Sequence, residues 1–276
     1  MPHTGREFHN KIIMVIGGGR GIGKRFAIGF AALGARLALV ARSKAELDLA
    51  HIEIEQHGGN ALRIRGDVVD PEQMAVAVDR VRVAYGGVPD VVICAAGVAG
   101  PLHSFLHSPL KQWKDALQIN LMGVVHACRA VLPGMIERRR GKVIVIACAS
   151  AVSPKLHFSS YATAKTAVVR FIEAIAPEVQ DDNVQINSLD PGPAYTSLTD
   201  EIIRAANRLD HNVVADAIET RRTGGTSPDE QMKVAAFLAS DASNHITGRL
   251  IHVEDDWRKL RNTTLKPDSF TLRRVK

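Results

Sequence analysis

The feature that most constrains the fold is a run of glycines between a short apolar segment and an alanine-rich one. Residues 11–16 (KIIMVI) have the composition of a buried strand, the next seven residues read GGGRGIG, and a helical segment then extends to Gly34. Glycine lets the backbone turn sharply and approach a pyrophosphate closely, and the N-terminus of the following helix attracts phosphate groups. A glycine cluster alone is equally consistent with an ordinary loop. After a first strand and before a helix, it predicts nucleotide binding.

Apolar segments recur along the chain, separated mostly by segments of helix length. With 276 residues, 46% of them hydrophobic, the chain is long enough for one well-buried core. Alternating strands and helices with right-handed crossovers predict an α/β fold, with a doubly wound parallel sheet and helices on both faces in a single domain. The expected strands lie near residues 11–16, 36–41, 61–66, 90–95, 142–148, 184–189 and 249–253.

Tyr161 and Lys165 are four residues apart in a segment with helix-like spacing, so both side chains are expected on one helix face. A nearby cation stabilises a phenolate and lowers the pKa of a tyrosine from its usual ~10. The pair is therefore a candidate general acid/base. Pairs with this spacing also occur on ordinary helix surfaces, so the pair gains weight only from the glycine turn that precedes it in the chain.

Together, these two segments make the chain resemble the short-chain dehydrogenase/reductase family over residues 11–253. The glycines here follow G-x-x-x-G-x-G. The resemblance implies a Rossmann-type fold, an oxidoreductase that transfers hydride between a nicotinamide cofactor and a ketone or secondary alcohol, and a homodimer or homotetramer built from the helices around 110–137 and 159–178. Further matches occur in the family's order: Asp67-Val68, Asn120 in INLMG, Asn187 with Pro191-Gly192, and FLASD at 237–241.

The resemblance also implies roles for individual residues. Tyr161 transfers a proton to or from the substrate oxygen, and Lys165 lowers the pKa of Tyr161 and binds the nicotinamide ribose. Asn120 holds a water that links Lys165 to solvent, although its amide is also suited to capping a helix kink. The implied cofactor-binding residues are Gly17, Gly19, Arg20, Gly21, Ile22, Gly23, Arg42, Asp67, Val68, Ala95, Gly97, Tyr161, Lys165, Pro191, Gly192 and Thr196.

The end of the second expected strand indicates which dinucleotide is bound. An NAD enzyme usually places a carboxylate there for the adenosine ribose hydroxyls, whereas this chain has Ala41 followed by Arg42, with Arg20 inside the glycine turn. Arginine donates two parallel hydrogen bonds to phosphate oxygens. The two arginines therefore favour NADP(H), although either one alone is consistent with an ordinary surface residue.

Cys148 departs from the family pattern. The family usually carries a serine thirteen positions before the tyrosine, to hydrogen-bond the substrate oxygen, and that position is Cys148 here. A thiol is a weak donor, and loss of one oxyanion donor costs roughly 10²–10³ in rate. Three readings stay open: Cys148 serves at reduced efficiency, Ser150 replaces it, or catalysis is impaired. The last reading leads to the alternative function, a nucleotide-binding regulatory or structural protein.

Composition excludes several other classes. The formal charge of +6 and the basic run at 138–140 are explained by solubility and by the end of an amphipathic helix, so we expect no nucleic-acid partner. Neither a signal-type apolar run nor the ~20 apolar residues of a membrane helix is expected, which predicts a cytoplasmic protein without a membrane partner. Cys94, Cys128 and Cys148 are expected to be reduced, and no metal site is expected.

Three further segments complete the expected organisation. Residues 1–10 form an N-terminal arm, and residues 193–227 form an amphipathic lid that selects the small-molecule substrate. Residues 254–276 form a tail that we expect to be mobile, with Trp257 near the lid or at a subunit contact. The lid arginines are suited either to an acidic substrate or to a solvated surface: Arg204, Arg208, Arg221 and Arg222.

Overall fold

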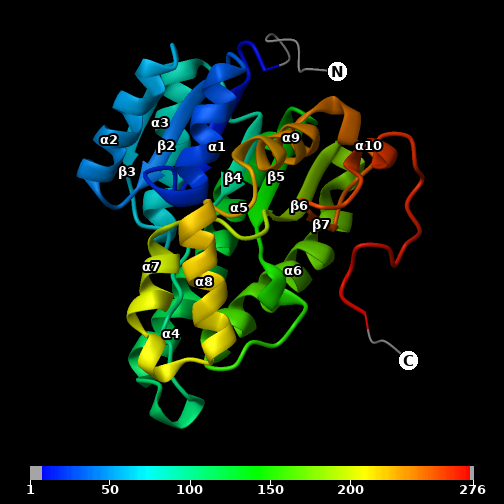
Figure 1. Cartoon of the computed structure of the whole chain (residues 1–276). Helices are drawn as coiled ribbons and strands as arrows, with labels where there is room; N and C mark the ends of the chain where they lie inside the picture. Colours follow the sequence, from blue (N-terminus) through cyan, green and yellow to red (C-terminus); the bar gives the residue numbers. More distant parts are fainter. Residues whose placement is uncertain (1–7, 274–276) are drawn as a thin grey trace.

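In the computed structural model, which describes residues 8–273, seven parallel strands form one sheet at the centre of the molecule (Figure 1). Their order in the sheet is β3-β2-β1-β4-β5-β6-β7, which confirms the predicted doubly wound fold. Residues 1–7 of the expected arm and 274–276 of the expected tail lie outside the described part. The strands are β1 Ile12–Ile16, β2 Arg36–Ala41, β3 Ala61–Arg65, β4 Val91–Cys94, β5 Gly141–Ile146, β6 Val184–Asp190 and β7 Leu250–His252.

Helices cover both faces of the sheet. The core has one large apolar cluster on each face of the sheet. The successive residues Met14 and Val15 of β1 belong to different clusters, because successive side chains of a strand point to opposite faces. Helices α1, α2 and α9 pack on one face, and α3, α5 and α6 on the other. The helices are α1 Gly21–Ala32, α2 Lys44–Gln56, α3 Pro71–Tyr85, α4 Leu110–Leu117, α5 Gly123–Glu137, α6 Ser159–Val179, α7 Ser197–Arg204, α8 His211–Thr223, α9 Pro228–Ala239 and α10 Trp257–Leu260.

Local sequence signals set the ends of these helices, as α3 illustrates. Asp70 caps its N-terminus by accepting hydrogen bonds from the N–H groups of Glu72 and Gln73, Pro71 occupies the first turn, and Gly86 ends the helix with φ of 72°. The Gln73 side chain in turn accepts a hydrogen bond from the Asp67 N–H at 2.9 Å. The start of α3 therefore fixes the loop after β3 at the carboxyl edge of the sheet.

One helix is long and apolar enough to span a membrane, although no such segment was expected from the sequence. The helix is Leu110–Glu137, which joins α4 and α5 through the π-helical segment Gln118–Met122, and it meets this criterion by length and composition. Within its most apolar window, 39% is buried inside the protein, where α4 packs on α6 and α5 packs on α3 and β5. A core helix passes the same test, so the absence of a membrane partner stays a prediction.

The described part of the C-terminal tail contacts the folded core at several points, whereas its mobility stays a prediction. Leu250 N–H of β7 donates to the Phe270 carbonyl at 2.8 Å, and Leu272 N–H donates to Glu173 of α6. Phe270 and Leu265 also pack against the main core cluster. Figure 1 shows the tail (red) leaving α10 and passing along the side of the molecule.

Trp257 packs against the core rather than near the lid, and its expected place at a subunit contact stays a prediction. It is 9% exposed in the main core cluster, and its indole ring lies 5.4 Å from the ring of Phe237 on α9. The Arg258 guanidinium lies 4.7 Å from the indole centroid on the outer side. Trp257 therefore belongs to the main core cluster, where it packs against α9.

We expect Trp257→Ala to lower the free energy of unfolding by about 3–5 kcal/mol, because it removes a large buried aromatic side chain and leaves a cavity against Phe237. Urea unfolding followed by circular dichroism measures the change. Val83→Ala is the control: Val83 is 82% exposed on α3, and its loss should change the free energy by about 0.5 kcal/mol or less. Equal values for the two variants would refute this role of Trp257.

Candidate active site

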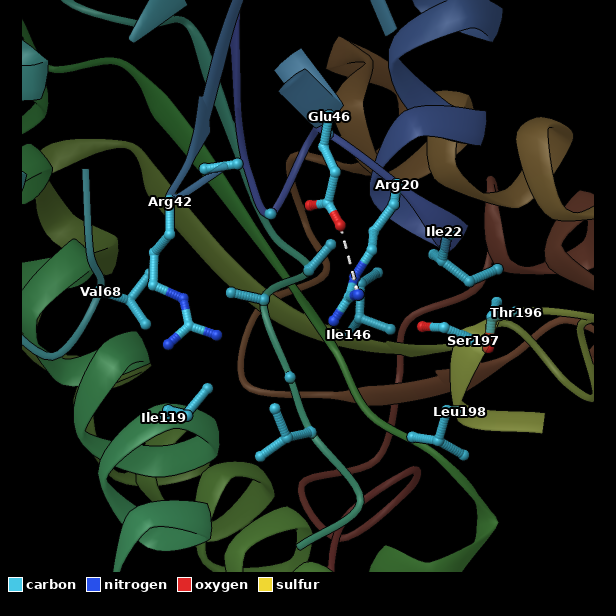
Figure 2. A pocket seen from close by; sticks show the side chains of 18 of the residues that line it. Arg20, Ile22, Arg42, Glu46, Val68, Ile119, Ile146, Thr196, Ser197 and Leu198 are labelled. Atoms are coloured by element: carbon cyan, nitrogen blue, oxygen red, sulfur yellow. Dashed lines mark hydrogen bonds and ion pairs between the residues drawn. The ribbon is translucent and has the colours of Figure 1, made fainter. Parts of the chain in front are cut away.

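A cavity of about 470 Å³ opens where the loops after β1, β2, β3, β4 and β5 meet, next to the start of α7 (Figure 2). This is the carboxyl edge of the sheet, at the point where the chain crosses from β3 to β4 on the other side of β1. Its volume lies in the range of small-molecule sites. The sequence-predicted residues that line it are Gly17, Gly19, Arg20, Gly21, Ile22, Arg42, Asp67, Val68, Ala95, Gly97, Tyr161, Lys165 and Thr196.

The glycines make room at the cavity wall. Gly17 has φ of +85°, and a Cβ added there would lie 2.4 Å from the backbone N of Ala96 in the loop after β4. At Gly97, an added Cβ would lie 2.8 Å from Asn120 Oδ1 and 3.9 Å from Lys165 Nζ. These glycines let two loops and the active-site side chains approach one another, which fits the cradle required by an extended dinucleotide.

Two helices begin at this cavity. Arg20 has an extended backbone at the N-terminus of α1, where no side-chain bond caps the helix. Thr196 begins α7, with its backbone N–H bonded to Thr199 Oγ1 at 3.2 Å, and lies near Ile22 in Figure 2. Helix N-termini present free N–H groups and positive dipole ends, both of which favour phosphate groups.

The two arginines predicted to bind a 2′-phosphate both line the cavity, and Figure 2 shows both guanidinium groups extending into it. Each has a carboxylate nearby. Arg20 Nη1 lies 3.3 Å from Glu46 Oε1, and Arg42 Nη1 lies 3.8 Å from Asp67 Oδ2. The sequence reasoning identified the arginines but not the charge of Glu46.

Tyr161 and Lys165 lie together on the first turns of α6, as their spacing predicts. The Lys165 ammonium is 5.8 Å from the centre of the Tyr161 ring and donates a hydrogen bond to the Ile146 carbonyl at 2.7 Å. Ile146 ends β5, so the central sheet fixes the depth of the lysine in the cavity. Lys165 is 6% exposed, and its burial lowers its pKa.

The expected lowering of the Tyr161 pKa by Lys165 is not found in the protein alone. Burial raises the pKa of Tyr161 well above its usual value, and the neighbouring Cys148 side chain and Asp190 carboxylate act in the same direction. The physical reason is that burial removes a phenolate from water, which disfavours the charged form. Tyr161 therefore keeps its proton at neutral pH.

Asn120 has the capping role that was the alternative to a water relay. It is fully buried in the π-helical segment, where its Nδ2 donates to the carbonyls of Ala116 and Val98 at 2.8 and 2.9 Å, and its Oδ1 accepts from the Val98 N–H at 3.2 Å. These three bonds hold the loop after Gly97 against the helix. The water relay stays a prediction.

Of the two candidates for the missing serine, Cys148 is the one beside the tyrosine. Its side chain is close enough to Tyr161 to help raise the pKa of the phenol, and its backbone is extended where the chain leaves β5. Cys148 is partly exposed, whereas Cys94 and Cys128 are buried and burial raises the pKa of both. Cys148 is therefore more accessible than the other two thiols, and it lies next to the residues that line the cavity rather than among them.

Some predicted residues lie behind the cavity. An added Cβ at Gly23 would be 2.2 Å from the Gly17 carbonyl oxygen, so the start of α1 packs directly against the glycine turn only because residue 23 has no side chain. Gly192 donates its N–H to Asp190 Oδ1, and Pro191 accepts from Gln231. They brace the loop after β6 rather than lining the wall.

Asp190 was missed by the sequence reasoning. It is 5% exposed at the end of β6, its Oδ2 lies 3.9 Å from His252 Nε2, and burial raises its pKa. Its charge affects both Tyr161 and Lys165. The sequence signal available was a carboxylate directly before Pro191-Gly192.

Helices α7 and α8 form an apolar cover beside Tyr161, as expected for the lid (Figure 1). Ile202, Ala205 and Ala217 are buried there and pack with Phe158. The lid arginines are exposed on the outer surface: Arg222 pairs with Glu219 and Arg208 contacts His103. Of the two expectations for these arginines, the solvated surface fits their positions.

A model of one protein family matches much of the chain. The family is described as short chain dehydrogenase, and the match covers residues 11–207. Among curated relatives, the 3-oxoacyl-[acyl-carrier-protein] reductase FabG of Escherichia coli (strain K12) is 28% identical over 247 residues, which are 90% of this chain and 97% of the relative.

Solved structures agree over nearly the same length. The structure of NAD+-bound xylitol dehydrogenase has a TM-score of 0.82 and 26% identity, and covers 90% of this chain and 98% of its own. A variant of actinorhodin polyketide ketoreductase with NADPH has a TM-score of 0.80 and 25% identity, and covers 88% and 95%. These two structures carry different dinucleotides, so similarity of fold does not distinguish NAD from NADP.

We expect Gly17→Ala to lower the free energy of unfolding by about 2–5 kcal/mol and to abolish binding of ADP, because a methyl group there strains the backbone and separates the loops after β1 and β4. Gly58→Ala is a matched control, since Gly58 has a similar φ of +77° with open space around it, and should cost only about 1–2 kcal/mol. Calorimetry measures both quantities. Full ADP binding by Gly17→Ala would rule out this turn as the binding site.

Proposed function

The chain belongs to the short-chain dehydrogenase family, and from this we propose that it is an NADPH-dependent oxidoreductase acting on a ketone or secondary alcohol. Members of this family use a nicotinamide cofactor, which when bound supplies or accepts the hydride.

One observation carries the proposal. A single cavity joins the glycine turn and the two arginines at one end to Tyr161 and Lys165 at the other. An extended dinucleotide with its phosphates at the helix N-termini would place its far end beside Tyr161. The same cavity would therefore bind the cofactor and present a proton donor to a substrate.

In the proposed reaction, Tyr161 donates its hydroxyl proton to the carbonyl oxygen. Burial, with the neighbouring Cys148 and Asp190 side chains, raises the pKa of Tyr161, so the phenol carries the proton that reduction of a carbonyl requires. Lys165, held by the Ile146 carbonyl, supplies positive charge next to the phenol as it loses its proton. Asn120 keeps the loop after Gly97 in place.

For the cofactor, Arg20 and Arg42 support the choice of NADP(H), because both guanidinium groups line the cavity near the loops after β2 and β3. For the substrate, the apolar cover formed by α7 and α8 supports a ketone with an apolar portion. The relatives named as a 3-oxoacyl reductase and a polyketide ketoreductase support a ketone substrate by similarity. Location in the cytoplasm and assembly into dimers or tetramers stay predictions.

We expect the purified protein to oxidise NADPH with at least one ketone from a panel of simple ketones, keto sugars, keto steroids and β-ketoacyl thioesters. With that ketone, Tyr161→Phe should lower kcat/KM by about 10²-fold or more, since the general acid is lost. NADPH absorbance measures the rate, with NADH run in parallel. Tyr195→Phe is the matched control on the lid, where the Tyr195 hydroxyl lies 3.3 Å from Asp200.

Intact activity in Tyr161→Phe would refute the catalytic role, and faster turnover with NADH would refute the cofactor choice. Cofactor binding without turnover on any ketone would favour the alternative of a regulatory nucleotide-binding protein, for which the thiol at Cys148 is the structural argument.

We also expect Cys148→Ser to raise the single-turnover rate roughly tenfold, because a hydroxyl is a stronger hydrogen-bond donor to the substrate oxygen than a thiol. Stopped-flow measurement of NADPH oxidation isolates this step from product release. Ser150→Ala should leave the rate unchanged. A loss of rate in Ser150→Ala with no gain in Cys148→Ser would assign the donor role to Ser150 instead.

A further inference from the structure

The carboxylate of Glu46 lies at the wall of the cofactor cavity, and the reaction proposed above gives it no role. Its Oε1 accepts a hydrogen bond from Arg20 Nη1 at 3.3 Å, and Figure 2 shows this contact beside the open part of the cavity. A negative charge next to an arginine expected to bind phosphate opposes that function, so its presence requires an explanation.

Helix capping explains only part of Glu46. The sequence Ser43-x-x-Glu46 is a capping-box pattern, in which the glutamate side chain returns to the N–H of the cap residue. Here the Glu46 N–H donates to Ser43 Oγ at 3.2 Å, which is one half of the box, while the Glu46 carboxylate is turned toward Arg20. The start of α2 therefore fixes the backbone of Glu46 and leaves its charge in the cavity.

Packing also keeps Glu46 beside the glycine turn. A Cβ added at Gly19 would lie 3.1 Å from the Glu46 Cβ, so the turn and the first turn of α2 are in direct contact. The Glu46 side chain is 35% exposed, which leaves its charge partly screened by solvent. A phosphate that reaches Arg20 must displace this carboxylate or lie next to it.

We propose that Glu46 is a specificity-determining residue of the cofactor cavity, whose carboxylate competes with a ribose 2′-phosphate for Arg20 and so limits the preference for NADP(H). With an unphosphorylated ribose, the carboxylate stays paired with Arg20 and is also able to accept a hydrogen bond from the 2′-hydroxyl, as acidic side chains do in NAD sites. A 2′-phosphate of about −1.5 to −2 charge is repelled by it. The inference rests on the proposed function, since it concerns the cofactor of that site.

The test compares binding of adenosine 2′,5′-bisphosphate and adenosine 5′-monophosphate, which differ by the 2′-phosphate alone, using isothermal titration calorimetry. Glu46→Gln removes the charge and keeps the size of the side chain. We expect it to tighten the Kd of the bisphosphate by about threefold to tenfold, with little change for the monophosphate. The gain should shrink in ~1 M salt, because charges are screened there.

Two controls separate this effect from general charge and from folding. Asp48→Asn removes the same charge from the same helix, but Asp48 pairs with Lys44 and Arg63 and does not line the cavity, so the ratio of the two Kd values should stay unchanged. In an Arg20→Gln background, the competition for Arg20 is absent, so Glu46→Gln should keep only the smaller part of its gain that comes from direct repulsion of the 2′-phosphate.

The outcomes distinguish this inference from the proposed function. If the bisphosphate binds more tightly than the monophosphate but equally to wild type and Glu46→Gln, the inference fails and the choice of NADP(H) stands. If wild type and Glu46→Gln both bind the two nucleotides equally, the choice of NADP(H) fails and the inference with it. An equal gain from Asp48→Asn would also overturn the inference.

Discussion

The active-site cavity depends on one constraint, the close approach of the backbone turns that follow β1 and β4. These strands are neighbours in the sheet, but their chains continue to opposite faces, which opens a crevice at the carboxyl edge. The turns meet there without side chains between them, since a Cβ at Gly17 would lie 2.4 Å from Ala96 N. The direction of α1, the position of Arg20 and the depth of the cavity follow from this contact.

Most of the fold and part of the site were predictable because they depend on local patterns. The ends of each expected strand lie within two residues of those observed, since most of these buried parallel strands read as largely apolar runs. The spacing of Tyr161 and Lys165 was enough to place both on α6. The roles of Glu46 and Asp190 were not predictable, because each depends on a partner distant in sequence or on burial.

Burial also explains why the pKa of Tyr161 was expected in the wrong direction. The sequence shows that a lysine is close, whereas desolvation depends on everything that surrounds the phenol, including Cys148 and the end of β6. The tail is a similar case. Its basic composition resembles an exposed segment, yet Leu265, Phe270 and Leu272 pack against core clusters that only the folded sheet brings near.

The packing of the tail beside β7 has a consequence for the sheet as a whole. A parallel sheet ends in a strand whose outer N–H and C=O groups lack a neighbour, and such an edge is a template for pairing with strands of other chains. In β7, the backbone N–H of Leu250 donates to the Phe270 carbonyl. The guanidinium group of Arg249, next to it, donates to the carbonyls of Pro267 and Ser269. Residues 267–270 thus occupy part of the edge at which a strand of another chain would otherwise pair.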